Sequence, residues 1–92
     1  MRDKKATKLA TERLFSALVA AELRRARNLH APLNSAHEGY AVILEEVDEF
    51  WEWCRLKREQ RSPDMGLLEL VQIGAMVQRL AEDLGLCPES EE

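Results

Sequence analysis

Apolar residues recur at intervals of three and four positions along most of the chain, which is the spacing of an amphipathic helix. In residues 3–29, one such stripe contains Ala10, Leu14, Phe15, Leu18, Ala21 and Leu29. In residues 36–60, one face carries Tyr40, Leu44, Val47, Trp51 and Cys54. We expect a helix over each segment, and we expect the second stripe to belong to the core.

The break between these two helices is marked by residues that stop and start helices. Pro32 and Asn34 interrupt the first pattern. Ser35 and Glu38 then have the spacing of a capping box, in which each side chain satisfies a free backbone N–H. The sequence therefore predicts that a helix begins directly after Ser35.

A third helix is predicted over residues 65–84. Ser62 or Asp64 is available as its N-cap, and Gly85 is well placed as the left-handed residue after its end. Residues 88–92 read as a solvated tail. Because the connection before the third helix is short, we expect the second and third helices to be antiparallel neighbours.

These elements predict one all-α domain over residues 1–92, since no segment alternates as a strand does. Apolar residues of the middle helix extend beyond a single stripe and include Ile43, Phe50, Trp51 and Trp53. A second apolar face favours a second subunit, so we expect homo-oligomerisation, as a dimer or a tetramer, to complete a four-helix-type bundle core. Scattered surface aromatics are the alternative reading.

Composition and charge narrow the class of protein. The formal net charge of −4 leaves no broad cationic face, so we expect no nucleic-acid partner. No apolar run approaches the roughly 20 residues of a membrane span, and no secretory hydrophobic region follows the N-terminus. Cys54 and Cys87 lie far apart and have no neighbouring His, which indicates reduced, inert thiols. We therefore expect a cytoplasmic protein without a membrane partner.

Acidic residues gather on the second predicted helix, at Glu45, Glu46, Asp48, Glu49 and Glu52. Glu49 shares a helix face with both Glu45 and Glu46, and each like-charge pair destabilises an isolated helix by a few tenths of a kcal/mol. The cluster favours a cationic partner or a metal ion. The alternative is a solvated acidic face that the following basic residues balance.

Glu69 makes the metal hypothesis stronger because it lies on the apolar stripe of the third predicted helix, among Met65, Ile73, Met76 and Leu80. A buried carboxylate costs several kcal/mol unless it is paired or metal-bound. Gln72 adds an amide oxygen on the same side. Antiparallel helices then set Glu46 and Glu49 opposite Glu69 and Gln72, and such oxygen ligands suit Mg²⁺ or Mn²⁺.

The pattern E-E-x-x-E on one helix and E-x-x-D on the next is that of the MazG-like all-α nucleotide pyrophosphohydrolases. This chain resembles them over about residues 35–84, with Glu45-Glu46-Val47-Asp48-Glu49 and Glu69-Leu70-Val71-Gln72 as the two halves. The segments HEGYAVILEEVDEFW and ELVQIGAM are similar to small phage-like and mobile-element members. Position 72 departs from the pattern, because Gln replaces the motif Asp.

The resemblance implies a Mg²⁺-dependent enzyme that converts a nucleoside triphosphate to the monophosphate and pyrophosphate and cleans the nucleotide pool. It assigns Glu46, Glu49, Glu69 and Gln72 to the metal, with Mn²⁺ as a second suitable ion. It assigns Glu45 to the positioning or deprotonation of the attacking water. Gln72 offers a neutral oxygen and no charge, which lowers the expected metal affinity.

Further candidates for substrate contacts surround the acids. His37 lies in the first turn of the second helix, and Trp53 is a candidate for stacking on a base. The candidates for phosphate contacts are Lys57, Arg58, Arg61 and Arg79. The alternative for His37 is an exposed residue of the cap region, and the alternative for Trp53 is packing in a dimer. The alternative for the four basic residues is an ordinary charged helix end or face.

A second hypothesis comes from another class of protein. A helical interaction module can keep the pyrophosphohydrolase scaffold and lack turnover, with Gln72 as the mark of that loss. A measurement of metal binding separates this hypothesis from the enzyme.

Overall fold

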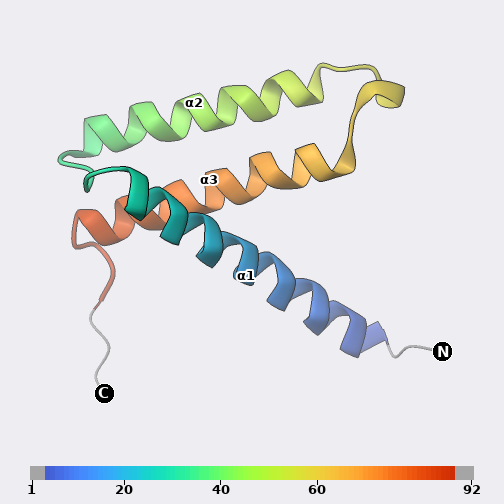
Figure 1. Cartoon of the computed structure of the whole chain (residues 1–92), viewed down its shortest axis with the longest axis horizontal. Coiled ribbons are helices and arrows are strands. Elements are labelled where there is room, and N and C mark those ends of the chain that lie inside the picture. The colour runs from blue at the N-terminus through green and yellow to red at the C-terminus, as the bar shows by residue number, and fades with distance from the viewer. Residues whose placement is uncertain (1–3, 89–92) are drawn as a thin grey trace.

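The computed structural model describes residues 4–88, with the side chains of residues 10–88. These residues form α1 (Lys4–Leu29), α2 (Ala36–Cys54), the short 3₁₀ helix η1 (Arg58–Gln60) and α3 (Pro63–Asp83), as Figure 1 shows. The described residues contain no strand, which confirms the all-α prediction. The predicted tail at 88–92 lies, apart from Pro88, outside the described residues.

The predicted capping residues define the ends of α2 and α3. The Ser35 hydroxyl accepts a hydrogen bond from the Glu38 backbone N–H at 3.0 Å, and the Glu38 carboxylate accepts one from the Asn34 N–H at 3.1 Å. The Ser62 hydroxyl accepts from the N–H three residues on, at 3.4 Å. Gly85 has φ 69°, which confirms its predicted left-handed backbone after α3.

The predicted end of the second helix at residue 60 is wrong, because α2 ends at Cys54. The chain is extended at Lys57, with φ −61° and ψ 147°, before η1 begins. The indole N–H of Trp53 donates to the Ser62 carbonyl at 2.8 Å and so ties the connection to the last turn of α2. A helix that continued to residue 60 would carry the chain away from the start of α3.

The core lies where the three helices meet. α2 and α3 are antiparallel neighbours, as predicted, and α1 crosses α3 with its N-terminal half extending beyond it (Figure 1). The buried cluster consists of Leu23, Ala26, Ala75 and Met76, with Val19, Val42 and Ile43 packed against it. Two small alanines in this cluster let the helices cross closely, so the core itself is small.

The stripe predicted as the core face of α2 is exposed within the single chain. Its members Tyr40, Leu44, Val47 and Trp51 are 67%, 43%, 41% and 58% exposed. The adjacent stripe, which contains Gly39, Val42 and Ile43, packs against the rest of the fold instead. Helical spacing identifies both stripes but does not show which one faces the core. The close approach of Leu80 to Gly39 places the stripe of Gly39, Val42 and Ile43 there.

The stripe of α1 is likewise mostly uncovered. Leu14, Phe15 and Leu29 are exposed, and Leu18 is half-buried. The residues of α1 that enter the core are Leu23 and Ala26, because α1 meets α3 only along its C-terminal half. Within residues 4–88, none of the helices combines the length and apolarity that a membrane crossing requires.

A polar network fastens the α1–α2 connection to the end of α3. Arg79, which is only 4% exposed, donates from Nη2 to the Ala31 carbonyl at 2.7 Å. Asp83 accepts from the Leu33 N–H and from Arg27, both at 2.8 Å. Burial by itself would raise the pKa of Asp83, but the Leu33 N–H and the Arg27 side chain outweigh it and lower that pKa.

Two glycines allow α2 and α3 to approach closely at both ends of their contact. A Cβ on Gly39 would lie 2.1 Å from Cδ1 of Leu80, and a Cβ on Gly66 would lie 2.6 Å from the ring of Trp53. A side chain at either position would force Leu80 or Trp53 to shift. Leu80 and Trp53 therefore lie directly over the backbone of the opposite helix, and the two contacts fix the register of the pair.

We predict that Gly39→Ala lowers the free energy of unfolding by up to about 2 kcal/mol, because displacing Leu80 costs about 1–3 kcal/mol and the gain in helix propensity offsets only about 1 kcal/mol. Gly74→Ala is the matched control, since its Cβ would meet Val19 Cγ2 at 3.3 Å and the helix gains about 1 kcal/mol of propensity. Urea unfolding followed by circular dichroism measures both. Equal losses of stability in the two variants would contradict the prediction.

Candidate metal centre

Three carboxylates from two helices meet between the two glycine contacts. Glu46 and Glu49 are three residues apart on α2, so they share one face of that helix, and Glu69 lies opposite on α3. One oxygen of each side chain lies within 4.8 Å of the corresponding oxygens of the other two. The antiparallel pairing thus brings together acids from both halves of the predicted motif.

These carboxylates are short of partners. None of the ion pairs recorded among residues 10–88 includes Glu46, Glu49 or Glu69. Glu46 and Glu69 are half-buried, and the Oε2 atom of each is fully enclosed and makes no hydrogen bond. An enclosed carboxylate oxygen without a donor is unfavourable. The centre therefore favours a bound proton or a bound cation.

The acidity of the centre reflects this shortage. Burial raises the pKa of Glu46 to about 7, and the negative charge of Glu49 adds to the effect. The pKa of Glu69 is also raised, by burial first and then by Glu49. A metal ion that binds these oxygens near neutral pH must therefore displace protons.

The donor set fits a small divalent cation. Carboxylate oxygens are the preferred ligands of hard ions such as Mg²⁺ and Mn²⁺. Two oxygens on opposite sides of Mg²⁺ are about 4.2 Å apart, because each Mg–O bond is about 2.1 Å. Adjacent oxygens around such an octahedral ion are only about 3.0 Å apart, so the three oxygens, which lie within 4.8 Å of one another, would draw closer together to bind one ion. Three protein ligands leave further positions for water or a ligand.

The two other predicted residues of the site lie beside the triad. Gln72 is half-buried and follows Glu69 by three residues, which places it on the same side of α3. Glu45 is exposed and borders a hollow of about 440 Å³ whose wall includes Glu46. Glu45 is thus open to solvent, whereas the Oε2 atom of the neighbouring Glu46 is enclosed.

Residues of the triad border two hollows. The first hollow is the one of about 440 Å³ that Glu45 and Glu46 border. The second hollow, of about 310 Å³, is bordered by Glu49 and Glu69 together with Trp53. A largely apolar third hollow of about 370 Å³ lies between α1 and α3. Glu46 thus borders the first hollow, and Glu49 and Glu69 border the second.

Two of the predicted substrate contacts have distinct surroundings. His37 is exposed in the first turn of α2, as expected for a cap-region residue. Trp53 is half-buried and stacks on Phe50 with ring centroids 5.7 Å apart, while it also packs over Gly66. The contacts of Trp53 hold the end of α2 in place, and its remaining edge borders the second hollow.

The predicted phosphate-binding cations are not gathered at the triad. Lys57 and Arg58 are exposed around the start of η1. The Arg61 guanidinium lies 5.6 Å from the centroid of the Trp53 ring, a cation–π contact. Arg79 borders the first hollow, but its side chain is buried and holds the backbone of the α1–α2 connection.

Two residues of α1 join this region although nothing in the sequence pattern indicates it. Glu22 and Arg25 form an ion pair, and both border the first hollow with Glu45 and Glu46. The charge of Glu22 contributes to the raised pKa of Glu46, after larger effects of burial and of the acids on α2 and α3. Only the crossing of α1 over α3 brings these residues to the site.

Comparison of the chain with protein-family models, with curated proteins and with solved structures finds no match. The resemblance described above therefore rests on the motif residues themselves.

We predict that the metal-free protein becomes less stable as the pH rises from about 5 to 8. The pKa of Glu46 is about 7 in the folded chain, and an unfolded Glu titrates near 4.3. The folded state therefore binds more protons in this window, so its stability is fully present below the unfolded pKa and is lost as the pH passes the folded pKa. Thermal melting in a chelator at a series of pH values measures the decline.

Glu46→Gln is the control for this prediction, because an amide does not titrate. The variant is expected to flatten the decline. A decline of unchanged size in Glu46→Gln would show that other groups cause it.

Proposed function

We propose that this chain is a Mg²⁺-dependent nucleoside triphosphate pyrophosphohydrolase. The observation that carries the proposal is the triad of Glu46, Glu49 and Glu69, with its two enclosed and unpartnered oxygens. The reaction class comes from the resemblance of residues 45–49 and 69–72 to the MazG-like motif. The proposed setting is the cytoplasm, where the enzyme would remove surplus or non-canonical nucleotides.

The proposed metal ligands are the three carboxylates, with the amide oxygen of Gln72 as a neutral neighbour. Mn²⁺ suits the same oxygens. A bound ion would neutralise part of the triphosphate charge and make a bound water more acidic. The two enclosed oxygens, on Glu46 and Glu69, come from different helices, so both helices must keep their register for the ion to be held.

The proposed reaction is attack of a water oxygen on the α-phosphorus. A bond forms between these two atoms, and the bond from the α-phosphorus to the oxygen that bridges to the β-phosphate breaks. The products are the monophosphate and pyrophosphate. Glu45, which is exposed beside Glu46, is the proposed acceptor of the proton from water. The first hollow has a volume typical of small-molecule sites.

We also propose a homo-oligomer, a dimer or a tetramer, whose interface covers the exposed stripe of α2 formed by Tyr40, Leu44, Val47 and Trp51. Contiguous apolar surface of this kind marks interaction sites in soluble proteins. The fold is thin, with extents of 45, 39 and 20 Å, so one chain encloses little core. A second chain would supply the missing cover and complete a four-helix-type bundle.

We predict that pyrophosphate is released from at least one nucleoside triphosphate in Mg²⁺ or Mn²⁺, and that Glu49→Gln lowers kcat/KM on the order of 100-fold or more. Loss of an outer-shell partner already costs 10–100-fold in metal sites, and Glu49 is a proposed direct ligand. A screen across canonical and damaged nucleotides measures the release.

The matched control is Asp48→Asn, which removes a charge from the neighbouring exposed position outside the triad. This variant is expected to keep its activity. The proposal fails if no nucleotide is cleaved, and Glu49 leaves the site if both variants turn over at the same rate.

A second candidate function is a helical interaction module without turnover. Two observations favour it: Gln72 replaces the acid of the motif, and the exposed stripe of α2 offers a surface for a partner. In that case the three acids would be held close without a metal ion, and their repulsion would persist in the folded chain.

Metal binding distinguishes the two candidates. We predict that Mg²⁺ or Mn²⁺ at about 100 times its Kd stabilises the enzyme by about 2.7 kcal/mol and raises its melting temperature. Glu69→Ala is expected to remove the effect. If neither ion raises the melting temperature and Glu69→Ala stabilises the protein, the acids are not a metal site.

A further inference from the structure

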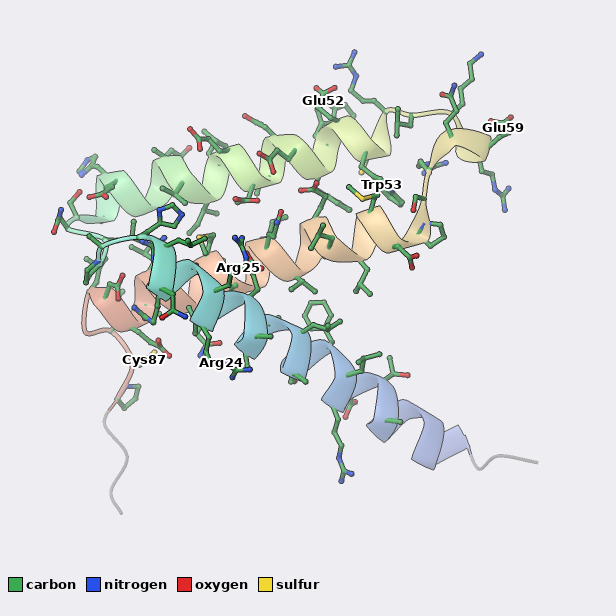
Figure 2. The ribbon with its side chains drawn as sticks, viewed as in Figure 1. Arg24, Arg25, Glu52, Trp53, Glu59 and Cys87 are labelled. Atoms are coloured by element: carbon green, nitrogen blue, oxygen red, sulfur yellow. The ribbon has the colours of Figure 1, made fainter. Side chains whose placement is uncertain are left out.

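The geometry points to Arg25 as the residue that binds the phosphates of the ligand, an inference that rests on the proposed function for the identity of that ligand. Arg25 borders the first hollow together with Glu45 and Glu46. Figure 2 shows its side chain on the side of α1 that faces α2, whereas Arg24 points to the opposite side. α1 therefore brings a cation to the site that α2 and α3 form.

The charge of the site creates the need for such a cation. Glu45 and Glu46 border the hollow that a triphosphate would approach, and Glu49 and Glu69 lie beside Glu46, so four carboxylates surround the proposed ion. A divalent ion offsets only two of these charges. A guanidinium fits this role because its fork of N–H donors matches the oxygens of a phosphate.

The other arginine that borders this hollow is already committed. Among the lysines and arginines of the described residues, Arg25 and Arg79 border the first hollow. Arg79 is buried and donates to the Ala31 carbonyl. The Arg25 side chain is 56% exposed, so it can meet a ligand that arrives from solvent.

Glu22 holds Arg25 in place and leaves part of its fork available. Nε of Arg25 donates to Oε2 of Glu22 at 3.0 Å, and Nη2 donates to the other oxygen. These two bonds leave Nη1 for a phosphate oxygen. The side chain of Glu22 is only 12% exposed, so the carboxylate is fixed beneath the guanidinium. Arg25 can therefore bind a phosphate and keep its pair with Glu22.

The alternative role for Arg25 is an ordinary ion pair on a helix surface. Such a pair three residues apart contributes only a few tenths of a kcal/mol to stability. Arg25→Gln is therefore expected to fold normally, and its effect on ligand binding can be measured without interference from unfolding.

The test is the binding of inorganic tripolyphosphate in Mg²⁺, measured by calorimetry at about 0.15 M salt, beside titrations with Mg²⁺ alone. Arg25→Gln is expected to raise the Kd for tripolyphosphate by about 10- to 100-fold, the usual value of a charged hydrogen bond. Its Mg²⁺ affinity should change little. Arg25→Lys should give an intermediate Kd, and Arg24→Gln, the matched control, should bind like the original chain.

Kinetics then separate this inference from the proposed function. With a cleaved nucleotide, Arg25→Gln should raise KM far more than it lowers kcat. Arg25 is excluded if Arg25→Gln matches the original chain or if Arg24→Gln is impaired equally, while turnover of the original chain still supports the enzyme. Arg25-dependent binding without any turnover would instead support the phosphate site and overturn hydrolysis. Absence of both binding and turnover would overturn both.

Discussion

The close antiparallel approach of α2 and α3 is the constraint on which the rest of this structure depends. Leu80 lies over Gly39 at one end and Trp53 lies over Gly66 at the other, so the two helices have one register available. In that register Glu46 and Glu49 face Glu69. A shift by one residue would rotate these side chains off the shared face, and the acid centre would no longer exist.

The same constraint explains why the centre is unfavourable without a partner ion. Helices this close exclude water from Oε2 of Glu46 and of Glu69 and offer no hydrogen-bond donor in its place. The small core of Leu23, Ala26 and the α3 residues beneath them must therefore hold three repelling acids together. The polar network around Asp83, at the far end of α3, supplies part of the cohesion that the core lacks.

The two halves of α1 have different roles, and the sequence pattern of α1 does not distinguish them. Its C-terminal half packs on α3 and sets Glu22 and Arg25 beside the acid centre. Its N-terminal half extends beyond α3 and leaves Leu14 and Phe15 uncovered, as the outer face of α2 leaves Tyr40 and Trp51 uncovered. On α2 the proposed site and the proposed subunit interface would thus use opposite sides of the helix, whereas on α1 they would use different halves of its length.

The sequence by itself determined the three helices, the cap at Ser35, the left-handed Gly85, and the encounter of Glu46 and Glu49 with Glu69, and it narrowed the cap of α3 to Ser62 or Asp64. These features depend on local spacing, on backbone hydrogen bonding and on one short connection, and all three are set by residues close together in the sequence. The sequence also showed that Gln72 stands where the motif has Asp.

Only the tertiary structure decided which of the two apolar stripes of α2 faces the core, where α2 ends, and what the arginines do. The stripe was chosen by the contact of Gly39 with Leu80, and the end of α2 by the bond from Trp53 to Ser62. Arg79 became a buried support, and Arg25 came to the acid centre, because α1 crosses α3. Such contacts join residues that are distant in the sequence. The helical period of one segment does not predict them, because it describes the faces of a single helix and not how two helices pack.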